Sequence, residues 1–327
     1  MSLICYFCNQ TMKRKITEFE YWPYKLLYAP FVPYWIWNSI KAGSFSYFCR
    51  ANPGIRFGGF LDYSKSEIMA QIPDEFKAET KFLKHKNDLT KLPDFPFIVK
   101  PDVGERGLNV ELIRDFEDWK NYKIKENLIV QEYIDLAYEF GVFYAKVPDR
   151  SVILSITGKE FLKFRSDGKT SLREFAESNP RCKNRVDYLS NKFKDDWDTI
   201  HSKGKEFLLE PIGNHNRGTR FFDASDLISE ELIKNIKKVA SAVKGFNYGR
   251  FDLKSESPEA LKKGRFKILE INGSNSEPTH IYDSKYSLWK AYGEIKRHLD
   301  IQYEISKNNP KTYSAKAFYG AVLKRLF

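Results

Sequence analysis

The stretch FKILEING, residues 266–273, begins as an ordinary apolar strand and ends in a carboxylate and an amide. Because side chains alternate along a strand, Glu270 and Asn272 are expected to project to the same side as Ile268. An ionised carboxylate on an apolar face is costly unless a cation or a set of hydrogen-bond donors meets it. The pair therefore predicts a site for a hard cation, and the alternative is a strand that runs out into solvent.

A second strand-like run, YGRFDLK at residues 248–254, lies close enough in sequence to predict an antiparallel hairpin with this stretch. Alternation places Arg250, Asp252 and Lys254 on one face of the run. Pairing of the two strands can then bring Asp252 beside Glu270 and Asn272. Two carboxylates and an amide oxygen could hold one or two Mg²⁺ ions and leave positions open for phosphate oxygens.

A nucleotide site also needs groups that bind phosphate, and the run VKPDVGERGLNV at residues 99–110 contains them. Lys100 lies near the expected end of a strand, and the loop that follows contains Gly104 and Gly107, whose backbone can approach phosphate closely. The loop matches neither GxxxxGK[ST] nor GxGxxG, and glycine turns after strands are common. By itself, this run is weak evidence for a nucleotide site.

The composition is that of a globular protein with a positively charged surface. The chain has 327 residues, of which 42% are hydrophobic and 16% aromatic, enough for two or three packed layers or lobes. The net charge of +11 favours anionic partners such as nucleotide phosphates, acidic substrates or anionic lipid. No RNA- or DNA-binding signature accompanies the charge, so we expect no nucleic acid partner. Four cysteines without a signal peptide predict a cytoplasmic protein.

The most hydrophobic segment is YWPYKLLYAPFVPYWIW, residues 21–37. Its apolar run is shorter than the ~20 residues that a membrane-spanning helix needs, and three prolines interrupt it. We expect the segment to pack over another lobe. The alternative is a weak association with a membrane surface, at its inner face, because tryptophans and tyrosines occur here beside lysines.

Other runs predict further elements from apolar alternation or helical periodicity. Strands are expected at residues 95–101, 127–134, 139–147 and 151–158. The last two would form a hairpin. Helices are expected within residues 64–76, where Pro73 ends a short helix, and at residues 169–203, 229–244 and 315–327. Ser229 is available as the N-cap of the third helix and Gly245 as its stop.

In their order along the chain, several of these runs resemble the ATP-grasp superfamily over roughly residues 60–300. The matching residues are Lys65, FIVKPDVGERG (97–107), LIVQEYI (128–134), Glu139, YGRFDLK (248–254) and LEING (269–273). Two more runs, SDGKTSLREF and GNHNRGTRFFDASD, are similar to segments of the peptide-forming members, the carboxylate-amine ligases of the D-alanine–D-alanine ligase type.

The resemblance implies an α+β fold, in which two α+β lobes hold ATP between antiparallel sheets. The expected organisation is an aromatic and proline-rich leader over residues 1–62, an N-lobe over 63–134, a C-lobe over 135–305 and a basic helix over 306–327. The leader has no βαβ pattern, so it departs from the N-terminal α/β domain that many ATP-grasp ligases have.

The resemblance also implies roles for individual residues in nucleotide binding. The residues that would bind ATP phosphates are Lys65, Lys100, Gly104, Arg106 and Gly107. Those that would form the adenine-binding hinge are Gln131, Glu132, Tyr133 and Ile134. Glu139 would bind the ribose hydroxyls. Gln131 stands where a glutamate is frequent, and Arg106 replaces a small residue. For Lys65, the alternative is an exposed helix lysine.

The remaining roles concern the metal and the reaction. The metal ligands would be Asp252, Glu270 and Asn272. The catalytic candidates are Arg250, Arg217 and Arg220. The candidate substrate contacts are Asn214, His215, Ser274, Asn275 and His280. For His280, the alternative is a loop histidine without a role.

The implied reaction joins a small-molecule carboxylate to an amine with ATP and Mg²⁺, or Mn²⁺, through an acyl phosphate. Two alternatives stay open at this point. One is an ATP-grasp kinase that acts on a hydroxyl or carbohydrate. The other is a non-catalytic nucleotide-binding module at a membrane surface.

Overall fold

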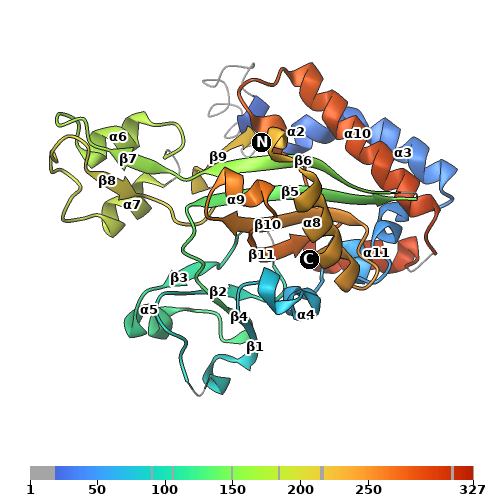
Figure 1. The fold of residues 1–327 in the computed structure, drawn as a ribbon, viewed down its shortest axis with the longest axis horizontal. Helices are drawn as coiled ribbons and strands as arrows, with labels where there is room; N and C mark the ends of the chain where they lie inside the picture. The colour runs from blue at the N-terminus through green and yellow to red at the C-terminus, as the bar shows by residue number, and fades with distance from the viewer. Residues whose placement is uncertain are drawn as a thin grey trace, which may run out of the picture.

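A computed structural model describes residues 19–89, 91–104, 107–148, 150–182, 185–213, 217–310 and 313–326. These residues form an α+β fold with two main antiparallel sheets, as expected from the sequence (Figure 1). The strand order is β1-β4-β2-β3 in the four-stranded sheet and β11-β10-β5-β6-β9 in the five-stranded sheet. None of the helices in the described ranges is long and apolar enough to cross a membrane.

The four-stranded sheet contains both strands that were predicted on either side of the glycine loop. Its elements, with two flanking helices, are α4 (Lys65–Gln71), β1 (Thr80–His85), β2 (Phe97–Pro101), β3 (Glu111–Ile113), α5 (Phe116–Asn121) and β4 (Glu126–Glu132). Ser64 caps α4 by accepting a hydrogen bond from Glu67 N. Alternate residues such as Phe97, Val99 and Val130 form the core of this lobe.

The five-stranded sheet contains both predicted hairpins. Its strands are β5 (Tyr138–Val147), β6 (Arg150–Glu160), β9 (Arg220–Asp223), β10 (Tyr248–Ser255) and β11 (Lys267–Asn272). Helices α8 (Glu230–Ala242) and α9 (Pro258–Lys262) are associated with it. The apolar stripe of α8 packs on one face of the sheet, and Ser229 is its N-cap as predicted. The helix ends just before Gly245, which has a φ of +63°.

The hairpin of β10 and β11 contains a bulge that alternation in the sequence did not predict. Asp252 lies opposite Glu270, but Leu253 lies opposite Ile268, so Leu269 is the extra residue. Ile268 is therefore buried in the core with Leu253, on the face opposite to Glu270. The expectation that Ile268 and Glu270 share a face was wrong, because a bulge shifts the alternation by one residue.

The other face of the five-stranded sheet is divided between core and candidate site. At one end Phe143, Ala145 and Tyr248 pack beneath η3 (Tyr47–Ala51) and α10 (Leu288–Lys307). Towards the other end, the same alternation in β5 and β10 presents polar side chains. The helical cover on this face thus positions the site next to an apolar core.

The leader consists of short helices that pack on the end of the chain. They are η1 (Phe19–Tyr21), α2 (Tyr24–Tyr28), η2 (Ala29–Phe31), α3 (Val32–Lys41), η3 and η4 (Arg56–Gly59). Leu27 is buried against Ile295 of α10, and Phe48 packs on Phe318 of α11 (Ala315–Leu326). The inward face of the leader thus covers another part of the molecule, as expected.

A further small unit projects beyond the large sheet (Figure 1, left). It consists of β7 (Lys163–Arg165), α6 (Leu172–Ser178), α7 (Val186–Lys192) and β8 (Glu206–Leu208). It has its own core, which includes Phe164, Leu172 and Leu189. Helices were predicted in this region, but the two-stranded sheet was not, because its strands have only three residues each.

Candidate active site

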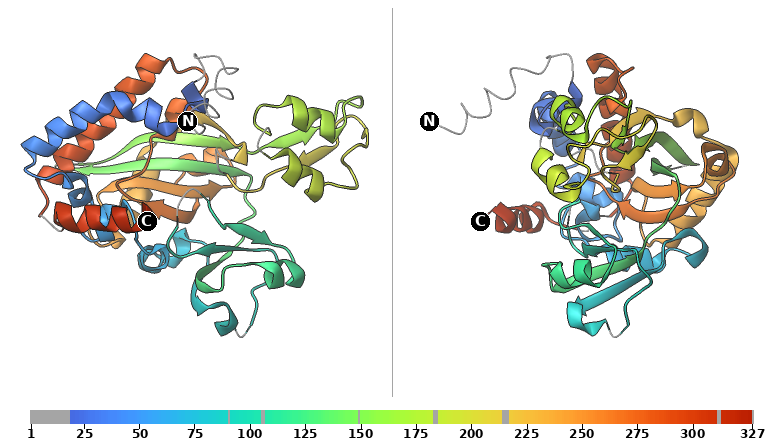
Figure 2. Two further views of the ribbon diagram at one scale, coloured as in Figure 1. Left: turned by 180° about the vertical axis from the view of Figure 1, so that it is seen from behind. Right: turned by 90° about the vertical axis from the view of Figure 1, so that its left-hand side faces the viewer.

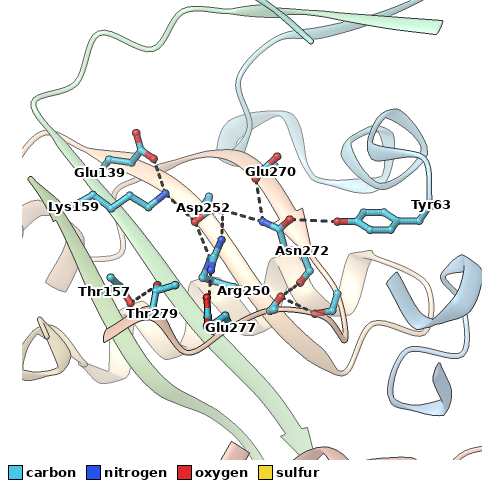
Figure 3. A network of polar contacts seen from close by, with 12 residues as sticks. Tyr63, Glu139, Thr157, Lys159, Arg250, Asp252, Glu270, Asn272, Glu277 and Thr279 are labelled. Carbon is cyan, nitrogen blue, oxygen red and sulfur yellow. Dashed lines mark hydrogen bonds and ion pairs between the residues drawn. The ribbon is translucent and has the colours of Figure 1, made fainter. Parts of the chain in front are cut away.

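The hairpin of β10 and β11 brings the three predicted metal ligands together (Figure 3). Asn272 Nδ2 donates to Asp252 Oδ2 at 2.8 Å and to Glu270 Oε1 at 3.1 Å. Asp252 is buried, while Glu270 and Asn272 are half-buried. We call these three residues the acidic trio.

Two cations hold the carboxylate of Asp252 in its ionised form. Arg250 donates from Nε and Nη2 to the two carboxylate oxygens at 3.0 Å each, and Lys159 Nζ lies 3.1 Å from Oδ1. Burial alone would raise the pKa of Asp252, but Arg250 and then Lys159 outweigh it and hold the pKa below its usual range. The carboxylate is therefore charged at neutral pH.

Lys159, which the sequence analysis did not single out, links the acidic trio to the predicted ribose-binding residue. Its Nζ lies 2.7 Å from Glu139 Oε1, and both side chains are buried. Lys159 lies in β6 directly opposite Glu139 in β5. Alternation along the run SVILSITGKE places Lys159 on the same strand face as Thr157, and this was the sequence signal that could have identified it.

The oxygen atoms of the acidic trio suit a hard cation, provided that Asp252 exchanges contacts with Arg250 and Lys159 and that the Asn272 amide turns. Oxygen ligands from carboxylates and amides are those that Mg²⁺ prefers. The side chain of Asn272 presents its NH₂ group to the carboxylates, while its Oδ1 accepts a hydrogen bond from Tyr63 at 3.3 Å. Turning the amide about its terminal torsion would present oxygen instead. Within the described ranges, no group of three or more His, Cys, Asp or Glu is placed to hold a metal.

The lysines predicted to bind phosphate lie where the four-stranded sheet meets β11. Lys100 Nζ donates to Gln131 Oε1 at 3.0 Å and to the carbonyl oxygen of Leu269 at 3.3 Å. This carbonyl belongs to the bulged residue, which has no partner residue in β10. Lys65 Nζ donates to the carbonyl oxygen of Gly104. Lys65 is thus buried against the glycine loop, and it is not an exposed helix lysine.

Burial lowers the pKa of Lys100, and the charge of Lys65 acts in the same direction. The charge of Glu270 is the largest influence that opposes this shift. Two lysines and the acidic trio therefore interact electrostatically across the junction of the two sheets.

The predicted hinge is fixed mainly by Gln131 and Lys254. Gln131 Nε2 donates to Thr80 Oγ1 and to the carbonyl oxygen of Leu269, both at 3.0 Å. Lys254 Nζ donates to the carbonyl oxygen of Ile134 at 2.8 Å. Its ammonium group also lies 4.9 Å from the centre of the Tyr133 ring. Glu132 is exposed, and its carboxylate accepts a hydrogen bond from the backbone of Glu79 at 3.0 Å.

Lys254 is the second site residue to which the sequence analysis assigned no role. It is buried in β10, opposite Glu139 of β5, and thus on the face that carries Asp252. Burial lowers its pKa. Alternation in YGRFDLK was sufficient to place it on this face, but its contact with the hinge depends on how the lobes pack.

The glycine loop is also contacted by Arg217, one of the catalytic candidates. Its Nη2 donates to the carbonyl oxygens of Gly107 and Val110 at 3.0 and 3.1 Å. Its Nη1 lies 3.6 Å from Glu210 Oε1. Arg217 therefore contacts the loop rather than the acidic trio. Three other candidates lie outside the described residues, namely Arg106, Asn214 and His215.

Four further candidates make their contacts elsewhere. Ser274 Oγ donates to the carbonyl oxygen of Phe48 at 3.0 Å, and Asn275 Nδ2 donates to that of Phe60 at 2.9 Å. Both residues therefore anchor the leader. Arg220 is half exposed, and its Nε donates to Glu160 Oε2 at 2.6 Å. His280 is buried, with Nε2 3.5 Å from Glu294 Oε2 in α10.

Comparisons with known proteins add a partial family match. Residues 62–137, which contain α4 and the whole four-stranded sheet, match the model of the tubulin-tyrosine ligase family. No curated protein matches the chain.

Several solved structures are similar to the chain at low sequence identity. D-alanine–D-alanine ligase from Bacillus anthracis matches with 15% identity and a TM-score of 0.40, over 74% of this chain and 66% of that chain. A bifunctional glutathione synthetase from Pasteurella multocida matches with 15% identity and a TM-score of 0.39, over 72% of this chain and 36% of that chain.

An L-amino acid ligase from Bacillus licheniformis matches with 14% identity and a TM-score of 0.36, over 64% of this chain and 40% of that chain. The chain therefore spans between about a third and two thirds of the length of these three proteins. Over residues 62–137, the chain is similar to the tubulin-tyrosine ligase family.

Proposed function

We propose that the protein is an ATP- and Mg²⁺-dependent ligase that joins a carboxylate to an amine through an acyl phosphate. The observation that carries the proposal is the convergence of the acidic trio with Lys65 and Lys100 at the junction of the two sheets. Separate lobes supply these groups, so a nucleotide bound at the junction would contact both. The match of residues 62–137 to a ligase family supports the same class of reaction.

The hinge and its neighbours would hold the nucleoside. Backbone groups of residues 131–134 would bind adenine, and Lys254 fixes the hinge by its hydrogen bond to Ile134. Glu139 would accept hydrogen bonds from the ribose, while Lys159 keeps its carboxylate close to Asp252. The phosphates would then extend towards Lys100 and the glycine loop, which Arg217 and Lys65 contact.

The proposed reaction is a two-step ligation that relies on the positive charges of Arg250, Lys65 and Lys100. An oxygen of the substrate carboxylate would attack the γ-phosphorus of ATP, forming an acyl phosphate and releasing ADP. An amine would then attack the acyl carbon, forming the amide and releasing phosphate and a proton. Arg250 and the two phosphate-binding lysines would neutralise the charge on the transferred group, which is the main catalytic demand in phosphoryl transfer. The acidic trio would hold Mg²⁺, which would supply positive charge to offset that of the phosphates.

Binding of the nucleotide is the first test. With Mg²⁺ present, ATP at a hundred times its dissociation constant should increase the free energy of unfolding by ~2.7 kcal/mol. Denaturant unfolding with and without Mg-ATP measures this difference. Absence of any effect would contradict the proposed site.

The class of reaction is tested by measuring ADP release with pooled carboxylic acids and pooled amines, separately and together. A ligase should need both pools for sustained release, and mass spectrometry should find an amide. Hydroxylamine in place of the amines should trap the acyl phosphate as a hydroxamate. Turnover with hydroxyl compounds alone, without hydroxamate, would instead support a kinase.

A further inference from the structure

The outward face of helix α3 is apolar, although α3 lies on the surface. Four of its residues point outward and are exposed, namely Val32, Ile36, Trp37 and Ile40. Trp37 is 57% exposed and Ile40 is 61% exposed. The polar residues Asn38 and Ser39 are buried instead. This is the reverse of the pattern that a surface helix of a water-soluble protein normally has.

The apolar face extends beyond α3. Tyr24 and Leu26 of α2 and Phe45 after α3 are also exposed. Between α3 and the start of α11 lies a hollow of about 560 Å³, whose lining includes Ile40, Phe45 and Ala315. Tyr319 of α11 donates to the carbonyl oxygen of Phe45 at 3.1 Å, so α11 lies beside the turn that follows α3. The leader and α11 project on the same side of the molecule (Figure 2, right).

Most of the net positive charge of the chain lies within residues 21–61 and 305–327, which contain α2, α3 and α11. Residues 21–61 contain four lysines and arginines and no acidic residue, and residues 305–327 contain five and no acidic residue. These two segments therefore account for nine of the eleven net positive charges. Between Lys25 and Lys41 there is no charged residue at all, so a cation flanks the uncharged face at each end.

We propose that the leader and α11 form a binding surface for an anionic lipid bilayer. Trp37 and its aliphatic neighbours would insert at the level of the headgroups, where tryptophan is favoured, while α2 and α3 lie parallel to the membrane. Lys25 and Lys41 would extend to the phosphates, and α11 would add long-range attraction.

A lipid surface fits these observations better than a protein partner does. A bilayer can bury an uncharged face that is flanked by cations, and it needs no specific complementary residues to do so. An anionic lipid surface also attracts all the lysines of the two segments at the same time. The proposal does not depend on the proposed catalytic function, because neither the acidic trio nor the phosphate-binding lysines belong to these segments.

The experiment is co-sedimentation of the full chain with two kinds of vesicle. One contains phosphatidylcholine alone, and the other contains phosphatidylcholine with phosphatidylglycerol. We expect binding to the anionic vesicles only, with a shift of tryptophan emission to shorter wavelength. Raising the salt concentration from about 0.1 M to about 0.5 M should weaken the binding, since it screens the lysines.

Two pairs of variants with matched controls identify the surface. Trp37→Ser with Ile40→Ser should weaken vesicle binding by about tenfold or more. The control is Phe116→Ser with Ile200→Ser, because these residues are similarly exposed, at 60% and 58%, but lie outside the leader. Lys25→Glu with Lys41→Glu should also weaken binding. Its control is Lys237→Glu with Lys263→Glu, two exposed lysines of the α8–α9 region.

Three results would overturn the proposal. The first is no binding to anionic vesicles by a folded protein. The second is equal loss of binding in the test and control variants. The third is a dimer in sedimentation equilibrium that Trp37→Ser with Ile40→Ser dissociates, because a second copy of the chain would then cover this face.

Discussion

Arg250 and Lys159 approach one carboxylate, that of Asp252, from two different strands. Both cations are largely buried, so the carboxylate offsets the free-energy cost of removing their charges from water. We therefore expect removal of the charge of Asp252 to affect folding as well as chemistry.

The variant Asp252→Asn should lose turnover and also lower the free energy of unfolding by about 3 kcal/mol, because it leaves buried cations without their partner. The variant Glu270→Gln should lose turnover but cost less than about 1 kcal/mol, since Glu270 is only half-buried and accepts a hydrogen bond from Asn272. Urea unfolding and ADP release measure the two effects. Equal stability of both variants would contradict a structural role for the charge of Asp252.

Lys254 offers a second test at this scale. Replacing it by methionine removes the donor to the carbonyl oxygen of Ile134 and should weaken ATP binding by about tenfold, through a less ordered hinge. Calorimetric titration with Mg-ATP measures the change. Lys237→Met, in an exposed position of α8, is the control. An unchanged affinity would show that the hinge does not need this lysine.

At the scale of single elements, α10 contains a buried histidine that links folding to pH. Burial lowers the pKa of His298 well below its usual range, and the charges of His280 and Arg297 act in the same direction. In the unfolded chain its pKa is about 6.5. Because the folded pKa is the lower one, His298 favours the folded state above about pH 6.5, and this contribution is lost as the pH falls.

We therefore expect the free energy of unfolding to decrease as the pH falls from about 7 to about 5. Glu294 should cause a second decrease in the free energy of unfolding at lower pH. Its pKa is lowered from 4.5 to about 2, first by the hydrogen bond with His280, with Arg297 adding to the shift against the effect of burial. His298→Gln should remove most of the first decrease, whereas His85→Gln, at an exposed position, should not. An unchanged pH dependence in His298→Gln would contradict this account.

Local sequence patterns predicted most of the elements, because each pattern depends on neighbouring residues. The apolar period with Ser229 and Gly245 predicted α8, and alternation predicted both hairpins. The acidic trio followed from the same alternation and strand pairing. The bulge at Leu269 could not be predicted from alternation, because it depends on how the two lobes meet at β11. Ser274 and Asn275 were assigned to a substrate, although their partners lie more than 200 residues earlier in the leader.

At the scale of the whole molecule, Asn52 is one of the residues that join the leader to the C-lobe. Its side chain is fully buried, accepts from the backbone N–H groups of Asn247 and Tyr248, and donates to the carbonyl oxygens of Gly58 and Tyr248. Asn52 Nδ2 also lies 3.3 Å from Ser274 Oγ. One leader residue therefore connects the start of β10 with the end of β11.

Asn52→Ala should lower the free energy of unfolding by about 3 kcal/mol, because it leaves several buried backbone groups without partners. It should also weaken Mg-ATP binding, since β10 carries Arg250 and Asp252. Asn275→Ala is the matched control and should cost about 1 kcal/mol, the value for one hydrogen bond. Urea unfolding distinguishes the two variants. Equal and small effects would show that the leader is only loosely attached.

The bonds of Asn52 have a consequence for synthesis on the ribosome. Tyr248 and Ser274 follow Asn52 by 196 and 222 residues, so they emerge about 10–40 s later at ordinary rates of translation. During that interval the aromatic leader has none of these partners, and chaperones or a nearby bilayer are the available covers for its apolar surface. A nascent chain arrested before residue 274 should therefore expose its leader to protease, and a chain released after α11 should protect it. Protease digestion of arrested ribosome complexes would measure when that protection begins.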